Sequence, residues 1–292
     1  MPILQVIILA VVQGLAELLP VSSSAHVVVA EKLMGLDPTT PQMTLLLVML
    51  HTGTMFAVIV YFWKQWKSAY FASAEAFKSF AVKVIAATAL TGTIGYPLKK
   101  IIEKIAFPGA PKAEIEELFG RLDIIAPALF AAGLLILIAG LREKKQAVEA
   151  GDDAILTLPQ SLWMGAIQGI CLPFRGFSRS GATISTGMLA GAIKEKAERF
   201  SFALAVVLTP PVVFVEAHRL LKATKEAALA GTPIDLHATL MTSLLGAVFA
   251  FLAGLVALKW LSSWLESGRW YLFGIYCIVA SAVVFFLHTR GF

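Results

Sequence analysis

Apolar residues along this chain gather in long uninterrupted segments and do not alternate with polar ones. Six segments reach the roughly 20 residues that a helix needs to cross a bilayer. No stretch shows the period-2 alternation of a strand, so the pattern argues against a soluble α/β enzyme and against a membrane β-barrel. The predicted spans are Thr44–Trp63, Phe80–Leu98, Leu122–Leu141, Phe200–Leu221, Leu236–Leu261 and Trp270–His288.

Two further apolar segments, Pro2–Leu36 and Leu158–Ala192, are interrupted in the middle by proline, glycine and serine. Each half has about ten to fifteen residues, which is too short to cross a bilayer alone. Non-helical backbone at membrane depth is tolerated only where it is buried in protein or faces a water-filled cavity. We therefore expect two re-entrant helical hairpins, each with its polar interruption at the tip.

The two interruptions resemble each other, since VVQGLAELLPVSSSAH begins at Val11 and AIQGICLPFRGFSRSGAT at Ala166. Three spans separate them, so the second hairpin should enter from the opposite membrane face. The sequence thus predicts an all-α integral membrane protein whose single domain, residues 1–292, is an inverted-topology repeat. The predicted halves are about 1–145 and 155–292, joined by the charged linker Arg142–Asp153. Sites in such repeats lie near the interface of the halves, so the two tips should meet.

The composition agrees with a membrane protein and narrows its partners. Only 15% of the residues are charged, against roughly 25% in soluble domains. The net charge of +5 comes without a basic run interleaved with aromatics, so we expect contact with anionic lipid and not with nucleic acid. A slight excess of Lys and Arg on one side predicts termini outside the cytoplasm. Tryptophans near segment ends are expected to be interfacial anchors: Trp63, Trp66, Trp260, Trp264 and Trp270.

The first tip combines groups that a plain membrane helix does not need. Gln13 and Glu17 are four residues apart and share one face of the first half-helix. Pro20 should end that helix, and a serine of Ser22–Ser24 should cap the next one, with His26 about one turn further on. A helix N-terminus of this kind attracts anions, phosphate above all.

The second tip repeats this arrangement with a cation added. Gly176 and Gly181 permit a tight turn and a close backbone approach. Arg179 offers a planar fork that matches phosphate oxygens. An arginine at membrane depth needs an anionic partner, for which the candidates are Glu17 and a bound phosphate. The hydroxyl groups at this tip belong to Ser178, Ser180 and Thr183.

Each of these groups also has a purely structural interpretation: a helix cap, a buried ion pair, a core histidine. Their coincidence at two membrane-depth tips favours phosphoryl transfer, which needs an electrostatic clamp, a nucleophile with a base and a carboxylate for a divalent cation. The competing hypothesis is a transporter or flippase for a lipid phosphate or anion, because inverted repeats with broken helices are frequent among secondary transporters.

Two motifs resemble one family over essentially the whole chain. QGLAELLPVSSSAH is similar to the E-G-x-T-E-x-L-P-V-S-S-T-G-H motif of the undecaprenyl-diphosphate phosphatase (bacitracin-resistance protein) family, and RGFSRSGATIS to its P-G-x-S-R-S-x-x-T motif. The resemblance implies a bacterial inner-membrane hydrolase that converts undecaprenyl diphosphate to the monophosphate carrier for peptidoglycan synthesis. It also implies a divalent cation (Mg or Ca), an active site facing the periplasmic side, and bacitracin resistance.

Carried over by position, the resemblance also suggests roles for individual residues. The nucleophile stays open between Ser23 activated by His26, a water positioned by His26, and His26 itself. His51 matches a polar position in relatives. The expected catalytic residues are Glu17, Ser23, His26 and Arg179; the expected diphosphate ligands are Ser22, Ser24, Arg175, Ser178, Ser180 and Thr183; and the expected metal ligands are Glu17 and Gln13.

The chain departs from the family motifs at two informative positions. Gln13 replaces the first glutamate, so a site with two carboxylates is in doubt. Arg175 replaces a proline, and we expect it either to tighten diphosphate binding or to form a salt bridge with Glu17. The expected partners are a prenyl diphosphate and membrane lipid. The sequence leaves the prenyl chain length and the oligomeric state open, a homodimer included.

Overall fold

The computed structural model describes residues 1–109, 115–146, 156–229, 234–265 and 269–292. Helices are the regular elements in these ranges, and no strand occurs among the described residues, which confirms the all-α class. In chain order they are α1 (Ile3–Leu18), α2 (Ser23–Leu33), α3 (Pro41–Tyr70), α4 (Ala74–Ala106), the 3₁₀ turn η1 (Ile115–Leu118), α5 (Leu122–Gln146), α6 (Leu158–Cys171), α7 (Arg179–Leu189), α8 (Lys194–Leu229), α9 (Leu236–Leu265) and α10 (Trp270–Thr289).

Six of the described helices are long and apolar enough to cross a membrane: α3, α4, α5, α8, α9 and α10. They contain the six predicted spans, so the protein is a multi-pass membrane protein. Helix α8 has 36 residues, about 54 Å at 1.5 Å per residue, and therefore extends beyond a hydrocarbon core of about 30 Å. Pro210 and Pro211 lie inside this helix, which continues through them; the kink expected there stays a prediction.

The two interrupted segments form pairs of short helices, as predicted. Helices α1, α2, α6 and α7 have 16, 11, 14 and 11 residues, all below the span length. Helix α1 ends where Pro20 follows, because a residue before proline avoids the helical region; Leu19 is extended, with φ −82° and ψ 147°. The lengths are consistent with re-entrant hairpins.

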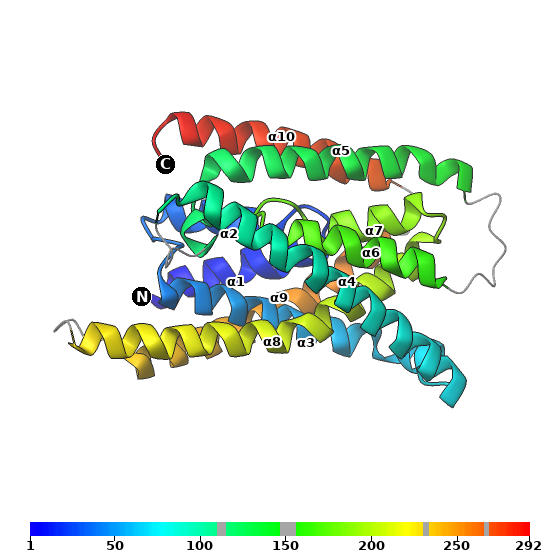
Figure 1. The fold of residues 1–292 in the computed structure, drawn as a ribbon, viewed down its shortest axis with the longest axis horizontal. Helices are drawn as coiled ribbons and strands as arrows, with labels where there is room; N and C mark the ends of the chain where they lie inside the picture. Colours follow the sequence, from blue (N-terminus) through cyan, green and yellow to red (C-terminus); the bar gives the residue numbers. More distant parts are fainter. Residues whose placement is uncertain (110–114, 147–155, 230–233, 266–268) are drawn as a thin grey trace.

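The hairpins begin at opposite ends of the molecule. Both termini lie at one end, whereas the end of α5 and the start of α6 lie at the other (Figure 1). Each hairpin is followed by three long helices. This order fits the predicted inverted repeat, while the equivalence of the two halves stays a prediction. Residues 147–153 of the proposed linker lie outside the described residues.

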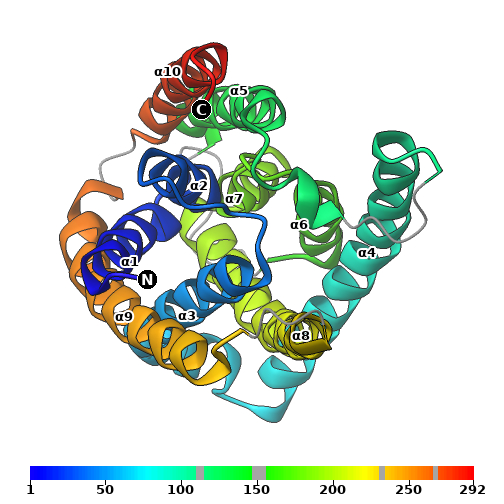
Figure 2. The same ribbon diagram turned by 90° about the vertical axis from the view of Figure 1, so that its left-hand side faces the viewer.

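Small residues let the helices approach each other closely. A Cβ on Gly165 of α6 would lie 2.4 Å from the Ala87 carbonyl oxygen of α4, and one on Gly53 of α3 would lie 2.0 Å from the Ala247 carbonyl oxygen of α9. Lipid tails are as apolar as leucine, so packing of this kind stabilises helix pairs in a membrane. Viewed from the end that holds the termini, α9 lies against α1 and α3, and α6 lies beside α4 (Figure 2).

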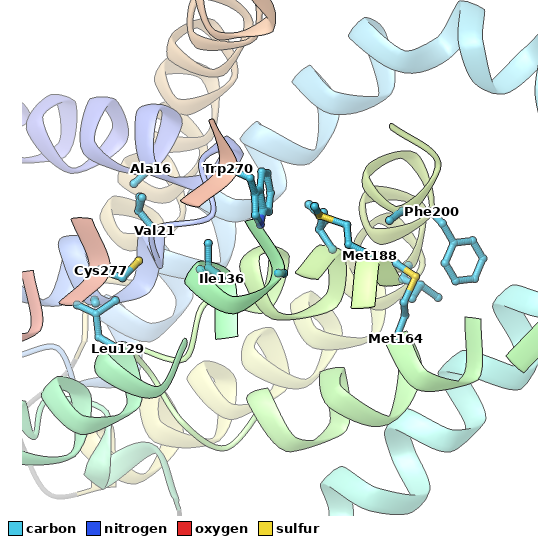
Figure 3. Close-up of a cluster of buried hydrophobic side chains, with 14 of the residues drawn as sticks. Ala16, Val21, Leu129, Ile136, Met164, Met188, Phe200, Trp270 and Cys277 are labelled. Carbon is cyan, nitrogen blue, oxygen red and sulfur yellow. The ribbon is translucent and has the colours of Figure 1, made fainter. Parts of the chain in front are cut away.

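Buried side chains from distant helices hold the tips in place. Val21 of the first tip, Met188 of α7, and Trp270 and Cys277 of α10 belong to one cluster (Figure 3). Cys171 is buried too, as expected for core cysteines.

The expectation that the tryptophans are interfacial anchors is only partly correct. Trp63 is exposed, but Trp66 is buried, and the buried Trp270 donates a hydrogen bond from Nε1 to Ser185 Oγ at 3.0 Å. These two lie close to a segment end in the sequence, yet neighbouring helices cover them. The side chains of Trp260 and Trp264 lie outside the described residues.

Candidate active site

The tips of the two hairpins touch, as the sequence predicts. Arg179 Nη2 on α7 donates a hydrogen bond to Glu17 Oε1 on α1 at 2.7 Å. A Cβ on Gly181 would lie only 2.9 Å from the Pro20 carbonyl oxygen and 2.6 Å from Ile136 Cδ1. The second tip therefore packs backbone to backbone on the first, which a glycine permits.

Glu17 is the centre of the contact and is 6% exposed. Besides Arg179, it accepts hydrogen bonds at Oε2 from Ser23 Oγ at 2.5 Å and from Gln13 Nε2 at 2.9 Å. Both carboxylate oxygens are thus hydrogen-bonded, and one faces a guanidinium, which compensates for the loss of hydration of a buried charge. The sequence left two candidates for the anionic partner of Arg179, Glu17 and a bound phosphate, and in the structure Arg179 pairs with Glu17.

His51 of α3 joins the same group of side chains. Its Nδ1 contacts Gln13 Nε2 and lies 3.7 Å from Glu17 Oε2. Gln13 therefore uses its amide nitrogen on both Glu17 and His51, and its Oε1 is buried without a hydrogen-bond partner among the described residues. His51 was noticed in the sequence through the family resemblance alone.

The start of α2 differs from the expected serine cap. Ser22 is the N-cap residue, but it is left-handed, with φ 67°, and its side chain accepts no hydrogen bond from the helix. Its Oγ lies 3.4 Å from Ser24 Oγ instead. The turn orients Ser22 away from the capping position, and no side chain in the described part of the chain caps the first N–H groups of α2. Such uncapped groups suit an anion.

The start of α7 has the expected cap. Ser178 Oγ accepts a hydrogen bond from the Gly181 N–H at 3.1 Å. Thr183 is fully buried, donates to the Arg179 carbonyl at 2.8 Å and pairs with Ser201 Oγ of α8 at 2.5 Å. Arg179 Nη1 reaches the Ser201 carbonyl at 3.5 Å. Thr183 thus supports the turn that carries Arg179, and Ser180 is buried beside it.

Ser201 is a neighbour that the sequence did not reveal. It lies in the apolar run of α8 and belongs to neither motif, and only the fold brings it to the second tip. Tyr276 of α10 was missed for the same reason, and it accompanies His26: His26 Nδ1 lies 2.8 Å from the Ser22 carbonyl oxygen, and Nε2 lies 2.7 Å from Tyr276 Oη.

Arg175 does not form the predicted salt bridge with Glu17, which pairs with Arg179 instead. Its guanidinium instead lies over the Phe119 ring, 4.0 Å from the ring centroid. Its Nη1 is buried and has no hydrogen-bond partner among the described residues. The second alternative, a contact with a diphosphate, stays a prediction.

The oxygen atoms at the first tip fit a hard cation that arrives with its own ligands. Among the described residues, no group of three His, Cys, Asp or Glu side chains could hold a metal. Glu17 offers one carboxylate, and Gln13 offers the unpartnered Oε1. Mg²⁺ is often held by one or two carboxylates together with substrate phosphates. Gln13 and Glu17 therefore suit Mg²⁺ or Ca²⁺ bound together with a diphosphate.

Comparisons with known proteins agree with these motifs. The family model described as bacitracin resistance protein BacA matches residues 6–283. The chain is 56% identical over 284 residues to undecaprenyl-diphosphatase 2 of Acinetobacter baylyi, covering 97% of each chain. It is 33% identical over 294 residues to undecaprenyl-diphosphatase 2 of Burkholderia ambifaria, covering 96% of this chain and 94% of the relative. The chain belongs to the bacitracin resistance protein BacA family.

Proposed function

We propose that the protein is an undecaprenyl-diphosphate phosphatase, which removes the terminal phosphate and releases undecaprenyl phosphate. The observation that carries the proposal is the contact between the two tips, where Glu17, Ser23 and Arg179 form one hydrogen-bonded group. The names of the relatives give the substrate. The activity would recycle the lipid carrier of peptidoglycan synthesis and confer bacitracin resistance.

Ser23 is the best candidate nucleophile, because its hydroxyl donates directly to a carboxylate. Glu17 Oε2 takes the Ser23 proton as Oγ attacks the terminal phosphorus. A bond forms between Oγ and phosphorus, and the bond from phosphorus to the bridging oxygen breaks. The prenyl monophosphate leaves, and the transferred phosphoryl group stays on Ser23.

Water then hydrolyses the phosphoserine. The water oxygen binds phosphorus, one water proton passes to His26, and the Ser23 Oγ–phosphorus bond breaks. Ser23 recovers its proton from Glu17, inorganic phosphate is released, and His26 gives the water proton to solvent.

Phosphate binding is assigned to the cationic and N–H groups around the tips. Arg179 has five N–H donors, and the Glu17 and Ser201 contacts leave several for phosphate oxygens. The uncapped start of α2 adds N–H groups for the transferring phosphoryl group. Ser22, Ser24 and Ser180 are the hydroxyl candidates, and Arg175 Nη1 is a further cation for the second phosphate.

A divalent cation is proposed at Glu17 and Gln13. When bound there with the diphosphate, it would neutralise charge that develops on the phosphate oxygens. Gln13 and Glu17 hold each other in place by the Nε2 hydrogen bond, which leaves Gln13 Oε1 without a partner among the described residues and available as an oxygen ligand.

The site is proposed to open to the periplasmic side of the bacterial inner membrane. The prenyl tail would stay in lipid between helices, and only the diphosphate would enter between the tips. No observation on the described residues or from the comparisons favours the transporter alternative.

The test is release of inorganic phosphate from a prenyl diphosphate by the purified protein in detergent, with Mg²⁺, with Ca²⁺ and with chelator. Detergent removes the two compartments, so transport cannot produce the signal. We expect cation-dependent release that is lost in both Glu17→Ala and Arg179→Ala. Breaking a buried ion pair costs about 3–5 kcal/mol, so thermal unfolding of each variant is measured in parallel.

Two further variants sharpen this test. Arg179→Lys keeps the charge and removes the fork, so it should fold and lose most of the activity. Arg121→Ala removes a side chain that is 55% exposed and paired with the nearby Asp123, and it should keep wild-type activity. A folded wild type that releases no phosphate with any cation or chain length would contradict the proposed function.

A further inference from the structure

His26 is held at both ring nitrogens by groups from different parts of the chain. Nδ1 lies 2.8 Å from the carbonyl oxygen of Ser22, one turn earlier at the first tip. Nε2 lies 2.7 Å from Tyr276 Oη, which α10 contributes from the far end of the sequence. The two rings are stacked, with centroids 5.7 Å apart and planes at 11°.

The chemistry of these contacts fixes the proton positions. A carbonyl oxygen can only accept, so His26 Nδ1 must carry a hydrogen. In the neutral ring, Nε2 then carries the free lone pair, and the Tyr276 O–H donates a hydrogen bond to it. Nε2 is therefore the only nitrogen of this imidazole that can take up a proton.

This arrangement separates His26 from Ser23. Ser23 donates to Glu17, and no hydrogen bond joins Ser23 to His26 among the described residues. The serine thus already has a base, whereas His26 directs its basic nitrogen to α10. The Tyr276 side chain is 47% exposed, and its neighbour Cys277 contacts the Pro20 carbonyl oxygen at 3.5 Å, so this part of α10 borders the first tip.

We propose that Tyr276 positions His26 for the hydrolysis and passes it the proton of the attacking water. Its hydroxyl and its ring hold His26 in one rotamer and one tautomer, and as the water attacks the phosphoserine, Tyr276 Oη takes the water proton while the Tyr276 hydroxyl proton passes to His26 Nε2. The inference rests on the proposed function, and it adds a residue from α10 and assigns the reactive nitrogen. It also assigns the side of the tip, between α2 and α10, on which the proton is transferred.

The first test is Tyr276→Phe, which keeps the ring and removes only the hydroxyl. We expect kcat to fall about ten- to hundredfold, less than the full 10²–10⁴ of a general base, while KM stays within about twofold. Tyr271→Phe is the matched control on the same helix and should keep the wild-type kcat. In a His26→Ala background, Tyr276→Phe should have no further effect, because the tyrosine acts through the histidine.

The second test examines the contact between His26 and Tyr276 without measuring enzyme activity. Protein labelled with ¹⁵N-histidine is compared by NMR in detergent, and the His26 signals are assigned by their loss in His26→Ala. The wild type should show Nδ1 protonated and Nε2 unprotonated, and Tyr276→Phe should shift the Nε2 signal.

The outcomes separate the two proposals. An active wild type with a normal kcat in Tyr276→Phe, or an equal loss with and without His26, would overturn the role of Tyr276 and leave the phosphatase standing. A wild type that releases no phosphate would overturn the proposed function itself, and with it this role.

Discussion

At the scale of single residues, the structure separates three serines that the sequence cannot. Ser22, Ser23 and Ser24 are adjacent, and no spacing rule prefers one of them. The left-handed conformation of Ser22 changes the direction of the chain, so that Ser23 reaches Glu17 while Ser22 and Ser24 face each other. The motif was visible in the sequence, but the backbone angle that orders its hydroxyl groups was not.

Ser23→Ala should therefore abolish the activity, whereas Ser24→Ala should not. Removing a nucleophile costs about a thousandfold or more in kcat, because the remaining groups bind the substrate but cannot replace the attacking oxygen. Phosphate release is measured for the two variants. In addition, wild-type protein quenched in acid during turnover is analysed for phosphoserine at position 23. A loss of only about tenfold in Ser23→Ala would make water the nucleophile.

At the scale of elements, sequence patterns located the helices and the breaks but not the neighbours that complete each tip. Apolar length predicted the six spans, and Pro20 predicted the end of α1, because both effects are local. Ser201 and Tyr276 lie in plain apolar runs, and they reach the tips only because α8 and α10 pack there. Long-range packing of this kind leaves no periodic signal in one sequence.

The turn of the first hairpin gives an element-scale prediction. A non-glycine residue in the left-handed region costs about 1–2 kcal/mol, which Ser22 incurs at φ 67°. Ser22→Gly should raise the unfolding temperature, and Ser22→Val should lower it, since a β-branched residue fits this conformation poorly. Thermal unfolding in detergent measures both.

Ser68→Gly is the control for that prediction. Ser68 lies in the last turns of α3, where glycine is a weaker helix former than serine and should lower the stability by about 0.5 kcal/mol or less. The same substitution should thus have opposite signs at the two positions. An equal loss of stability at both would show that the turn at Ser22 is not strained.

At the scale of the whole molecule, the two Gln-Gly pairs can be compared position by position. Their glycines pack in the same way, whereas their glutamines form different hydrogen bonds. Gly14 packs against Ala253 of α9, and Gly169 packs against Thr91 of α4, so each hairpin rests on a long helix from the other predicted half. The glutamine side chains differ. Gln13 bonds Glu17, whereas Gln168 bonds Thr91, and Leu172 stands four residues after it. The repeat therefore predicts the packing, while the carboxylate occurs at one tip only.

The orientation in the membrane is the property of the whole molecule that can be tested most directly. The α3–α4 connection lies at the end opposite the termini, and the C-terminal end of α4 lies at the same end as the termini (Figure 1). The slight excess of Lys and Arg predicts that the end with the termini faces outwards. The native Cys171 and Cys277 are 3% and 0% exposed, so they should not react with a thiol reagent and need not be removed.

Single cysteines at the two ends of α4 should therefore report the orientation. Lys104, in the last turn of α4, and Ala72, before its first turn, are both exposed. In spheroplasts, a membrane-impermeant maleimide should label Lys104→Cys and spare Ala72→Cys, and detergent should make the two label equally. The wild type, with only its buried cysteines, is the control. The reverse labelling pattern would place the termini in the cytoplasm. Intrinsic reactivity cannot produce either pattern, because a difference in reactivity between the two cysteines would persist in detergent.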